Sequence, residues 1–94
     1  MKISDLQAGM SGISLKAKVV DISEIRKVRT KYGPRRVADA TLEDETGKIK
    51  LILWEKQIDS VSVGDTIEIS GSFVTEFRNE LQLNVPKSGK IEKI

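Results

Sequence analysis

Apolar residues recur at every second position in short segments of this chain, and turn-forming residues separate the segments. In residues 15–19, leucine, alanine and valine alternate with lysines, and residues 36–43, 49–54, 67–77 and 81–85 show the same period. A period of two places successive side chains on opposite faces of a β-strand. Residues 55–63 are too short and irregular for more than one helical turn. The sequence therefore predicts an all-β protein with five strands.

Two of these segments change phase part-way along. After Val19 the apolar face moves by one position, to Val20 and Ile22, which predicts a β-bulge and a sharp bend. Gly71 predicts a second bend, because glycine inside a strand often marks one. Beyond Gly71 the inward side chains become Ser72 and Val74, and the outward ones become Phe73, Thr75 and Phe77. Strands that bend in this way can serve a small closed sheet.

Turn residues divide the predicted strands. Asp44–Gly47 has the composition of a hairpin turn, Val63–Asp65 leads into the fourth strand, and Arg78–Asn79 joins the fourth strand to the fifth. Residues 26–36 lose the apolar pattern and are expected to form a basic loop. Five short antiparallel strands with little or no helix between the third and fourth match the five-stranded Greek-key OB-fold barrel, a fold that binds oligonucleotides. A simple meander and an SH3-like barrel are the alternatives.

The composition excludes several classes of chemistry. The 94 residues suffice for a single domain, residues 1–94, and they include neither cysteine nor histidine. Disulfides, thiolate nucleophiles and a zinc site are therefore not expected. The acidic run Glu43–Glu45 falls in a hairpin turn, and no glycine-rich phosphate loop is present. We expect no catalytic residues, no metal, no cofactor and no small-molecule substrate.

The charge and hydropathy patterns bear on location and partners. No segment is apolar and long enough to span a bilayer, and the first residues lack the apolar region of a signal peptide. These features predict a cytoplasmic protein without a membrane partner. The formal net charge is only +2, so the positions of the charges matter more than their sum.

Three of the four aromatic residues fall on strand faces that point away from the aliphatic core. Trp54 shares its face with Ile52 and with Lys50, which is a further candidate for binding nucleic acid, and Phe73 shares its face with Phe77. Leucine, isoleucine and valine suffice for the interior, so outward aromatics favour base stacking, at about 1–3 kcal/mol per base. The alternative is that one of them completes the core or caps the end of the barrel.

Cations gather in the predicted loop between the first and second strands. In an OB fold this loop and the one between strands four and five flank the binding groove. The expected phosphate-binding residues are Arg29, Lys31, Arg35, Arg36, the loop's Arg26 and Lys27, and Arg78 in the opposite turn. Tyr32 at the loop tip is a candidate for clamping a base. The alternatives are a merely solvated loop and a Tyr32 that packs on Pro34.

Two stretches resemble a known family: VADATLEDETGKIKLILW, from Val37 to Trp54, and GSFVTEFRNELQLN, from Gly71 to Asn84. They resemble the archaeal single-OB single-stranded DNA-binding proteins, which are relatives of replication protein A. The resemblance implies that Trp54, Phe73 and Phe77 stack on bases. Phe73 stands where relatives often carry Trp, which implies weaker stacking at that position.

The function predicted from these features is binding of single-stranded DNA, largely without sequence preference, in replication or repair. RNA is an alternative ligand, because neither stacking nor phosphate contacts read the 2′-hydroxyl. A protein-interaction subunit of a replication or repair complex is the other alternative, with the aromatics as hot spots. That alternative predicts few cations around the aromatics, whereas this sequence places lysines and arginines beside them.

Overall fold

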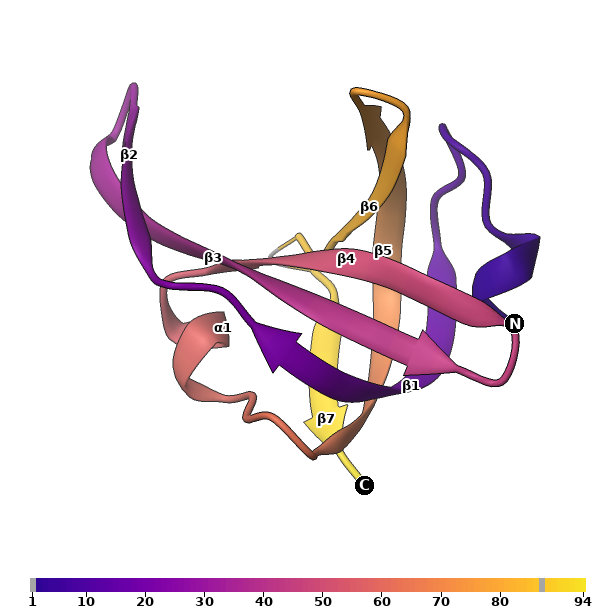
Figure 1. The fold of residues 1–94 in the computed structure, drawn as a ribbon. Helices are drawn as coiled ribbons and strands as arrows, with labels where there is room; N and C mark the ends of the chain where they lie inside the picture. The colour runs from indigo at the N-terminus through magenta and orange to yellow at the C-terminus, as the bar shows by residue number, and fades with distance from the viewer. Residues whose placement is uncertain (1, 87) are drawn as a thin grey trace.

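The computed structural model describes residues 2–86 and 88–94 of the chain as an almost entirely β structure (Figure 1). Two very short helices accompany seven strands. In chain order the elements are η1 (Ile3–Asp5), β1 (Ile13–Ile22), β2 (Arg26–Thr30), β3 (Gly33–Asp44), β4 (Gly47–Trp54), α1 (Lys56–Asp59), β5 (Thr66–Phe77), β6 (Glu80–Asn84) and β7 (Lys90–Lys93).

Five of the strands form a closed ring. The pairing order is β1–β3–β4–β6–β5, and β5 pairs again with β1. These five are the strands predicted from the sequence, and the four-residue helix α1 between β4 and β5 fits the expected single helical turn. The OB-fold class is thus confirmed. The prediction that all strands run antiparallel is wrong, because β4 and β6 pair in parallel, with Leu51 opposite Leu83.

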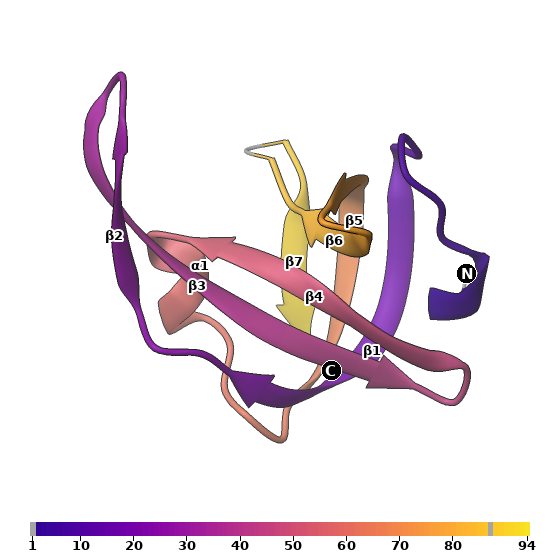
Figure 2. The ribbon, with the colours of Figure 1, turned by 45° about the horizontal axis from the view of Figure 1, so that its top comes forward.

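Both predicted bends are present and allow the ring to close. In β1 the register against β3 shifts between Val19 and Asp21. In β5, Gly71 adopts φ +69°, and the register against β1 shifts between Ile13 and Leu15. A Cβ atom at Gly71 would lie 3.1 Å from the Cα of Gly89, so this position also permits a close backbone approach. Figure 2 shows β1 and β5 curving along the same side of the ring.

Residues 26–36 are not an irregular loop, as the sequence suggested, but a β-hairpin. The strand β2 pairs along its whole length with the first part of β3, from Arg26 opposite Val37 to Thr30 opposite Gly33. The turn is held by the Thr30 hydroxyl, which donates to the Gly33 carbonyl at 2.8 Å and accepts from the Tyr32 amide at 3.2 Å. The hairpin projects away from the core and carries polar side chains on both faces. Hydrophobic alternation, the signal of a half-buried strand, is therefore missing from this segment.

The interior of the ring is filled by aliphatic side chains. Its largest fully buried apolar side chains are Val19, Leu42, Leu51, Leu53, Ile67, Ile69 and Leu83. Ser72 is also fully buried, and its hydroxyl donates to the Ile13 carbonyl at 3.0 Å, so its burial leaves no unpaired polar group. Neither helix in the described part of the chain has the length and hydropathy needed to cross a membrane.

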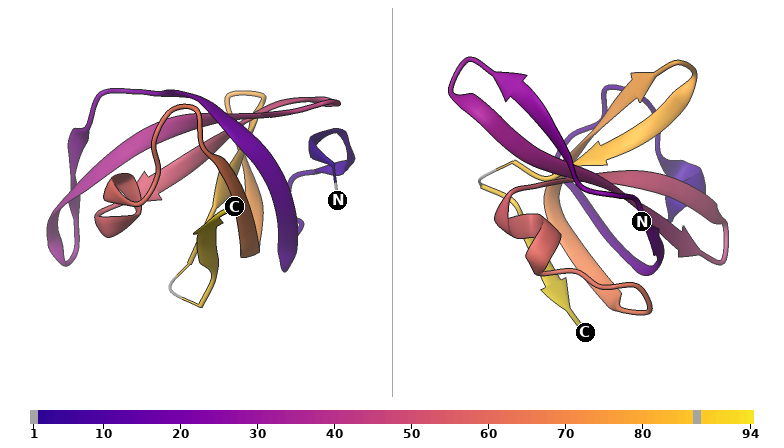
Figure 3. Two further views of the ribbon diagram at one scale, coloured as in Figure 1. Left: turned by 90° about the horizontal axis from the view of Figure 1, so that it is seen from below. Right: turned by 60° about the vertical axis from the view of Figure 1, so that its left-hand side comes forward.

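Two hairpins rise from the same side of the ring. Figure 1 and the right-hand view of Figure 3 show the β2–β3 hairpin and the β5–β6 hairpin diverging, with β4 crossing between their bases. The short strand β7, beyond the five predicted, pairs with β5 away from this opening. The outer face of β3, β4, β6 and β5 is thereby left uncovered between the two hairpins.

The Asp44 carboxylate joins the N-terminal segment to the β3–β4 turn. It accepts hydrogen bonds from the amides of Ile3, at 2.8 Å, and Thr46, at 2.7 Å, and also from the Thr46 hydroxyl and the Gly47 amide. Desolvation acts to raise the pKa of Asp44, but these hydrogen bonds outweigh it and lower the pKa from 3.8 to about 2.

This pKa predicts a pH-dependent contribution to stability. A folded-state pKa below the unfolded value means that the carboxylate stabilises the fold above about pH 4 and that this stabilisation is lost as the pH falls toward about 2. We expect Asp44→Asn to lower the urea midpoint at neutral pH and to reduce the drop in midpoint between these two pH values. Parallel pH profiles of the two proteins would contradict this role for Asp44.

Candidate nucleic-acid interface

The uncovered outer face is built by the register of three strands. Ile52 on β4 lies opposite Asn84 on β6, and Asn84 lies opposite Phe73 on β5. Because every second side chain along a strand points to the same face, Trp54 joins Ile52 and Phe77 joins Phe73. Residues from three separate strands, such as Ile52 and Asn84, therefore meet on one surface.

A continuous groove runs along this face. One part, with a volume of about 570 Å³, is lined by Trp54, Phe73, Asn84, Arg35 and Pro86 among others. The adjoining part, about 590 Å³, is lined by Trp54, Asn84, Ile52, Phe77, Lys50 and Arg26 among others. Trp54 and Asn84 line both parts, so the two form a single channel. We call it the aromatic groove.

The three aromatics occupy the predicted outward positions. Trp54 and Phe73 are each 37% exposed, and Phe77 is 59% exposed, whereas the described buried core contains no aromatic residue. Val37 and Ile52 are buried on the same outer face and form an apolar floor beside Trp54. None of these three residues belongs to the described buried core. Each ring has one part packed on the protein and another part open to the groove.

Hydrogen bonds fix the backbone around Trp54. The Trp54 amide donates to the side-chain oxygen of Gln57 at 2.9 Å, and the Gln57 amide group donates to the Val85 carbonyl at 2.9 Å. The next residue, Glu55, has φ +48° and accepts from the Arg36 amide at 2.7 Å. These contacts tie the end of β4 to β3 and to the residue after β6, so the backbone that carries the indole is held in place.

The adjacent arginines Arg35 and Arg36 point to opposite faces of β3. Arg35 lines the aromatic groove and makes no ion pair with any residue in the described part of the chain. Arg36 instead lies within 3.6 Å of the Glu55 carboxylate and 3.4 Å of the Asp59 carboxylate, beside α1. The structure therefore brings Arg35, but not Arg36, to the aromatics.

The tip of the β2–β3 hairpin extends beyond the groove. Arg29 lies opposite Pro34 and shares the face of Arg36, whereas Val28 shares the groove face with Arg35. Tyr32 is 75% exposed, and the Lys31 ammonium lies 5.2 Å from the centre of its ring. Arg29, Lys31 and Tyr32 do not line the aromatic groove.

At the other end of the groove, two cationic side chains interact with groups of the protein itself. The Lys50 ammonium lies 3.2 Å from the Glu80 carboxylate. The Arg78 guanidinium lies 5.2 Å from the centre of the Phe77 ring. Arg78 and Asn79 both have positive φ, +52° and +66°, as in the tight two-residue turns that join hairpin strands.

For two groove residues, Asn84 and Arg26, the sequence did not predict a position beside the aromatics. Asn84 lies in the middle of the groove, and its amide donates to the Thr75 hydroxyl at 3.0 Å. Arg26, named only as part of a basic loop, lines the groove and pairs with Asp39 at 3.0 Å. The outward phase of residues 80–84 was the available signal for Asn84. Arg26 required the β2–β3 pairing, which the sequence pattern does not reveal.

Comparison with known proteins identifies the family. Residues 6–93 match the family described as "Single-stranded DNA binding protein Ssb-like, OB fold". The chain belongs to this family. Its members are binding proteins and not enzymes, which confirms the prediction of a non-catalytic protein, and the resemblance noted in the sequence is confirmed as well.

Individual Ssb-like relatives agree with this assignment. The single-stranded DNA binding protein Ssb of Saccharolobus solfataricus is 34% identical over 96% of this chain, which spans 61% of that protein's length. The second OB-fold domain of replication protein A from Methanococcus maripaludis is 30% identical, with a TM-score of 0.80, over 100% of this chain and 93% of that one. An OB domain from Thermoplasma acidophilum, 24% identical, has the same fold, with a TM-score of 0.87 over 100% of this chain and 85% of that one.

The placement of the aromatics in this Ssb-like chain predicts different costs for truncating surface and core residues. Phe77→Ala should lower the free energy of unfolding by about 1 kcal/mol or less, because the ring is mostly exposed. Leu51→Ala, at a fully buried position, should cost about 2–5 kcal/mol. Urea unfolding of both variants checks this. A Phe77 variant as unstable as the Leu51 variant would mean that Phe77 supports the core.

Proposed function

We propose that this Ssb-like chain binds single-stranded DNA in the aromatic groove, largely without sequence preference. The single observation that supports this most is the alignment of three half-exposed aromatics along one continuous groove. Every base has a π face, so stacking on Trp54, Phe73 and Phe77 accepts any sequence, at about 1–3 kcal/mol per base. Bases inside a duplex have no free faces, so the same groove disfavours duplex DNA.

Phosphate contacts from the groove rim are the second part of the proposal. Arg35 at one end, Arg26 along the side, and Lys50 and Arg78 at the other end follow the line of the aromatics. We assign Arg29, Lys31 and Tyr32 to contacts with a longer DNA strand, one that continues from the groove over the tip of the β2–β3 hairpin. Arg36 takes a supporting role, because its two carboxylate partners hold it beside α1.

The relatives extend this proposal to a cellular role. Replication factor A of Methanothermobacter thermautotrophicus is 34% identical over 97% of this chain, although the chain spans only 12% of that protein. We infer a role in DNA replication or repair, with other proteins of these processes as further partners. A cytoplasmic location belongs to the same proposal.

RNA is the competing ligand. Stacking and phosphate contacts serve both nucleic acids, and only contacts to the 2′-hydroxyl distinguish them. The family likeness favours DNA. Parallel titrations with dT and rU oligomers of equal length decide between them.

Trp54 provides a direct test of stacking. Its indole is the only one in the chain, so fluorescence reports on this position alone. We expect a dT oligomer to quench the emission strongly and duplex DNA of the same length to quench it far less. The control is Phe73→Ala, which should keep the quenching but weaken affinity by about 1–3 kcal/mol. Equal quenching by duplex, or none by either ligand, would refute the stacking model.

The opposed arginines provide a matched pair for the phosphate contacts. About three neutralised phosphates give a slope of log K against log salt of roughly −2, at about −0.7 per phosphate for single strands. Arg35→Ala should flatten this slope by about 0.7, whereas Arg36→Ala should leave it nearly unchanged. Fluorescence titrations between low and moderate salt measure both slopes. If the slope flattened equally in the two variants, DNA would contact Arg35 and Arg36 alike, and the assignment of the two arginines to different roles would be wrong.

A further inference from the structure

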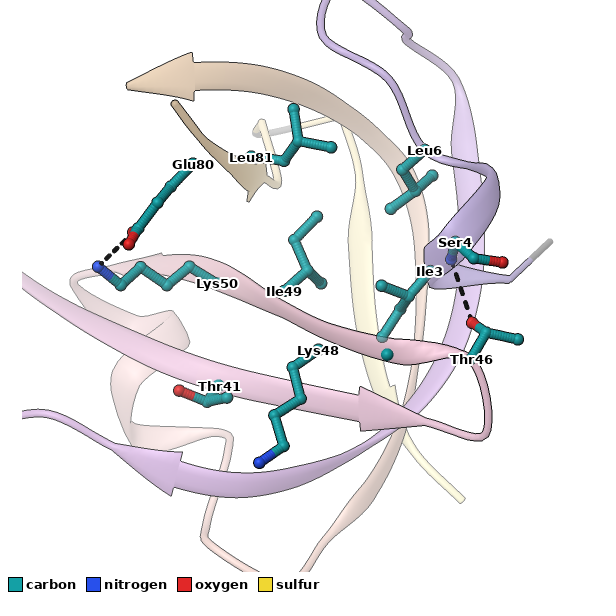
Figure 4. A pocket seen from close by; sticks show the side chains of 11 residues that line it. Ile3, Ser4, Leu6, Thr41, Thr46, Lys48, Ile49, Lys50, Glu80 and Leu81 are labelled. Atoms are coloured by element: carbon teal, nitrogen blue, oxygen red, sulfur yellow. Dashed lines mark hydrogen bonds and ion pairs between the residues drawn. The ribbon is translucent and has the colours of Figure 1, made fainter. Parts of the chain in front are cut away.

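Glu80 is an anion at one end of a groove proposed to bind an anionic strand. It lies directly opposite Phe77 across the two-residue β5–β6 turn, and its side chain is well exposed. Its carboxylate holds the Lys50 ammonium at 3.2 Å, and Lys50 lines the groove together with Phe77 and Trp54. Figure 4 shows this contact spanning from β6 to β4. The Glu80 carboxylate is thus paired with a lysine, Lys50, that lies beside the proposed stacking position of Phe77.

The two ends of the groove differ in this respect. At the Trp54–Phe73 end, Arg35 has no carboxylate partner in the described part of the chain. At the Phe77 end, Lys50 is paired with Glu80, and Arg78 lies over the Phe77 ring. One end therefore presents a free cation to a ligand, and the other end satisfies its charges internally.

The Lys50–Glu80 pair also separates two cavities. A further cavity of about 580 Å³ lies between η1 and the start of β6, and Figure 4 shows Leu6, Ile49 and Leu81 around it. Lys50 lines both this cavity and the aromatic groove. A DNA strand that continues past Phe77 toward this second cavity would meet the Lys50–Glu80 pair on its way.

We propose that Glu80 competes with a DNA phosphate for Lys50 and so limits affinity at the Phe77 end of the groove. This inference rests on the proposed function. A base stacked on Phe77 brings its phosphate near both side chains, and Lys50 then exchanges Glu80 for the phosphate. The exchange is feasible, because an ion pair between exposed side chains contributes little to stability.

The exchange has a specific signature in salt dependence. In the wild-type protein the freed Glu80 carboxylate stays close to the phosphate and attracts cations in its place, so less counterion is released at this position. Without the carboxylate, Lys50 neutralises the phosphate with full counterion release. Glu80→Gln should therefore make the slope of log K against log salt more negative, by up to about 0.7.

Affinity at low salt should rise as well. Two unit charges about 6 Å apart in water repel with an energy that corresponds to about a threefold change in Kd. We expect Glu80→Gln to tighten binding of a dT oligomer of about 16 nucleotides, the upper end of the range for one OB fold, by at least this factor. The gain should shrink as salt increases, because salt screens the repulsion.

The chain offers a matched control in the Glu43–Lys48 pair. It also joins an exposed carboxylate to an exposed lysine across neighbouring strands, at 3.5 Å, but Lys48, unlike Lys50, does not line the aromatic groove. Glu43→Gln makes the same change in net charge. It should give a smaller gain in affinity and leave the salt slope unchanged.

Fluorescence titrations of wild type, Glu80→Gln, Glu43→Gln and the double variant Lys50→Gln/Glu80→Gln, at several salt concentrations, test the inference. Support consists of a steeper slope in Glu80→Gln that disappears in the double variant. Equal behaviour of Glu80→Gln and Glu43→Gln would overturn it, and so would a steeper slope that persists without Lys50. Failure of the wild-type protein to bind dT would instead refute the proposed function, so the two failures are distinguishable.

Discussion

Closure of the strand ring depends on β1, which belongs to two pairings at once. Residues 18–22 of β1 pair with β3 on both sides of the register shift between Val19 and Asp21, and residues 13–18 pair with β5. A straight strand cannot serve both partners in so small a ring, and a bulge supplies the necessary bend. The parallel contact between β4 and β6 completes the circuit. The placement of every groove residue follows from these registers.

An aliphatic interior leaves the aromatics free for the surface. Apart from Ser72, the buried positions in the described chain are filled by leucine, isoleucine, valine and alanine, which pack well on the pleated inner faces. Trp54, Phe73 and Phe77 are each in phase with the outer face, and the buried Val37 and Ile52 provide an apolar floor. The rings are therefore partly packed and partly exposed, an arrangement that orders them while keeping a face open. Such pre-organisation lowers the entropy lost on binding.

The charges around the groove are organised mainly by pairing within the protein. Arg26 and Lys50 each have a carboxylate partner within 4 Å, and so does Arg36 on the opposite face of β3. Exposed pairs of this kind are weak, so a phosphate can replace the carboxylate. The positive charge available to DNA therefore depends on which of these ion pairs a phosphate can displace. A count of lysines and arginines overstates that charge.

Much of this protein follows from its sequence. Period-two alternation determined the five ring strands, and the phase shifts at Val19 and Gly71 located the bends, because side-chain burial on one face of a strand leaves a local trace in the sequence. The same phase placed the three aromatics outside the core.

Tertiary structure alone decided the rest. The β2–β3 hairpin has no buried face and leaves no such trace, and the parallel β4–β6 pairing joins segments that are distant in the chain. Only those pairings separate Arg35 from Arg36, bring Asn84 to the groove and place Glu80 beside Lys50, because contacts between strands are set by register and not by neighbouring residues.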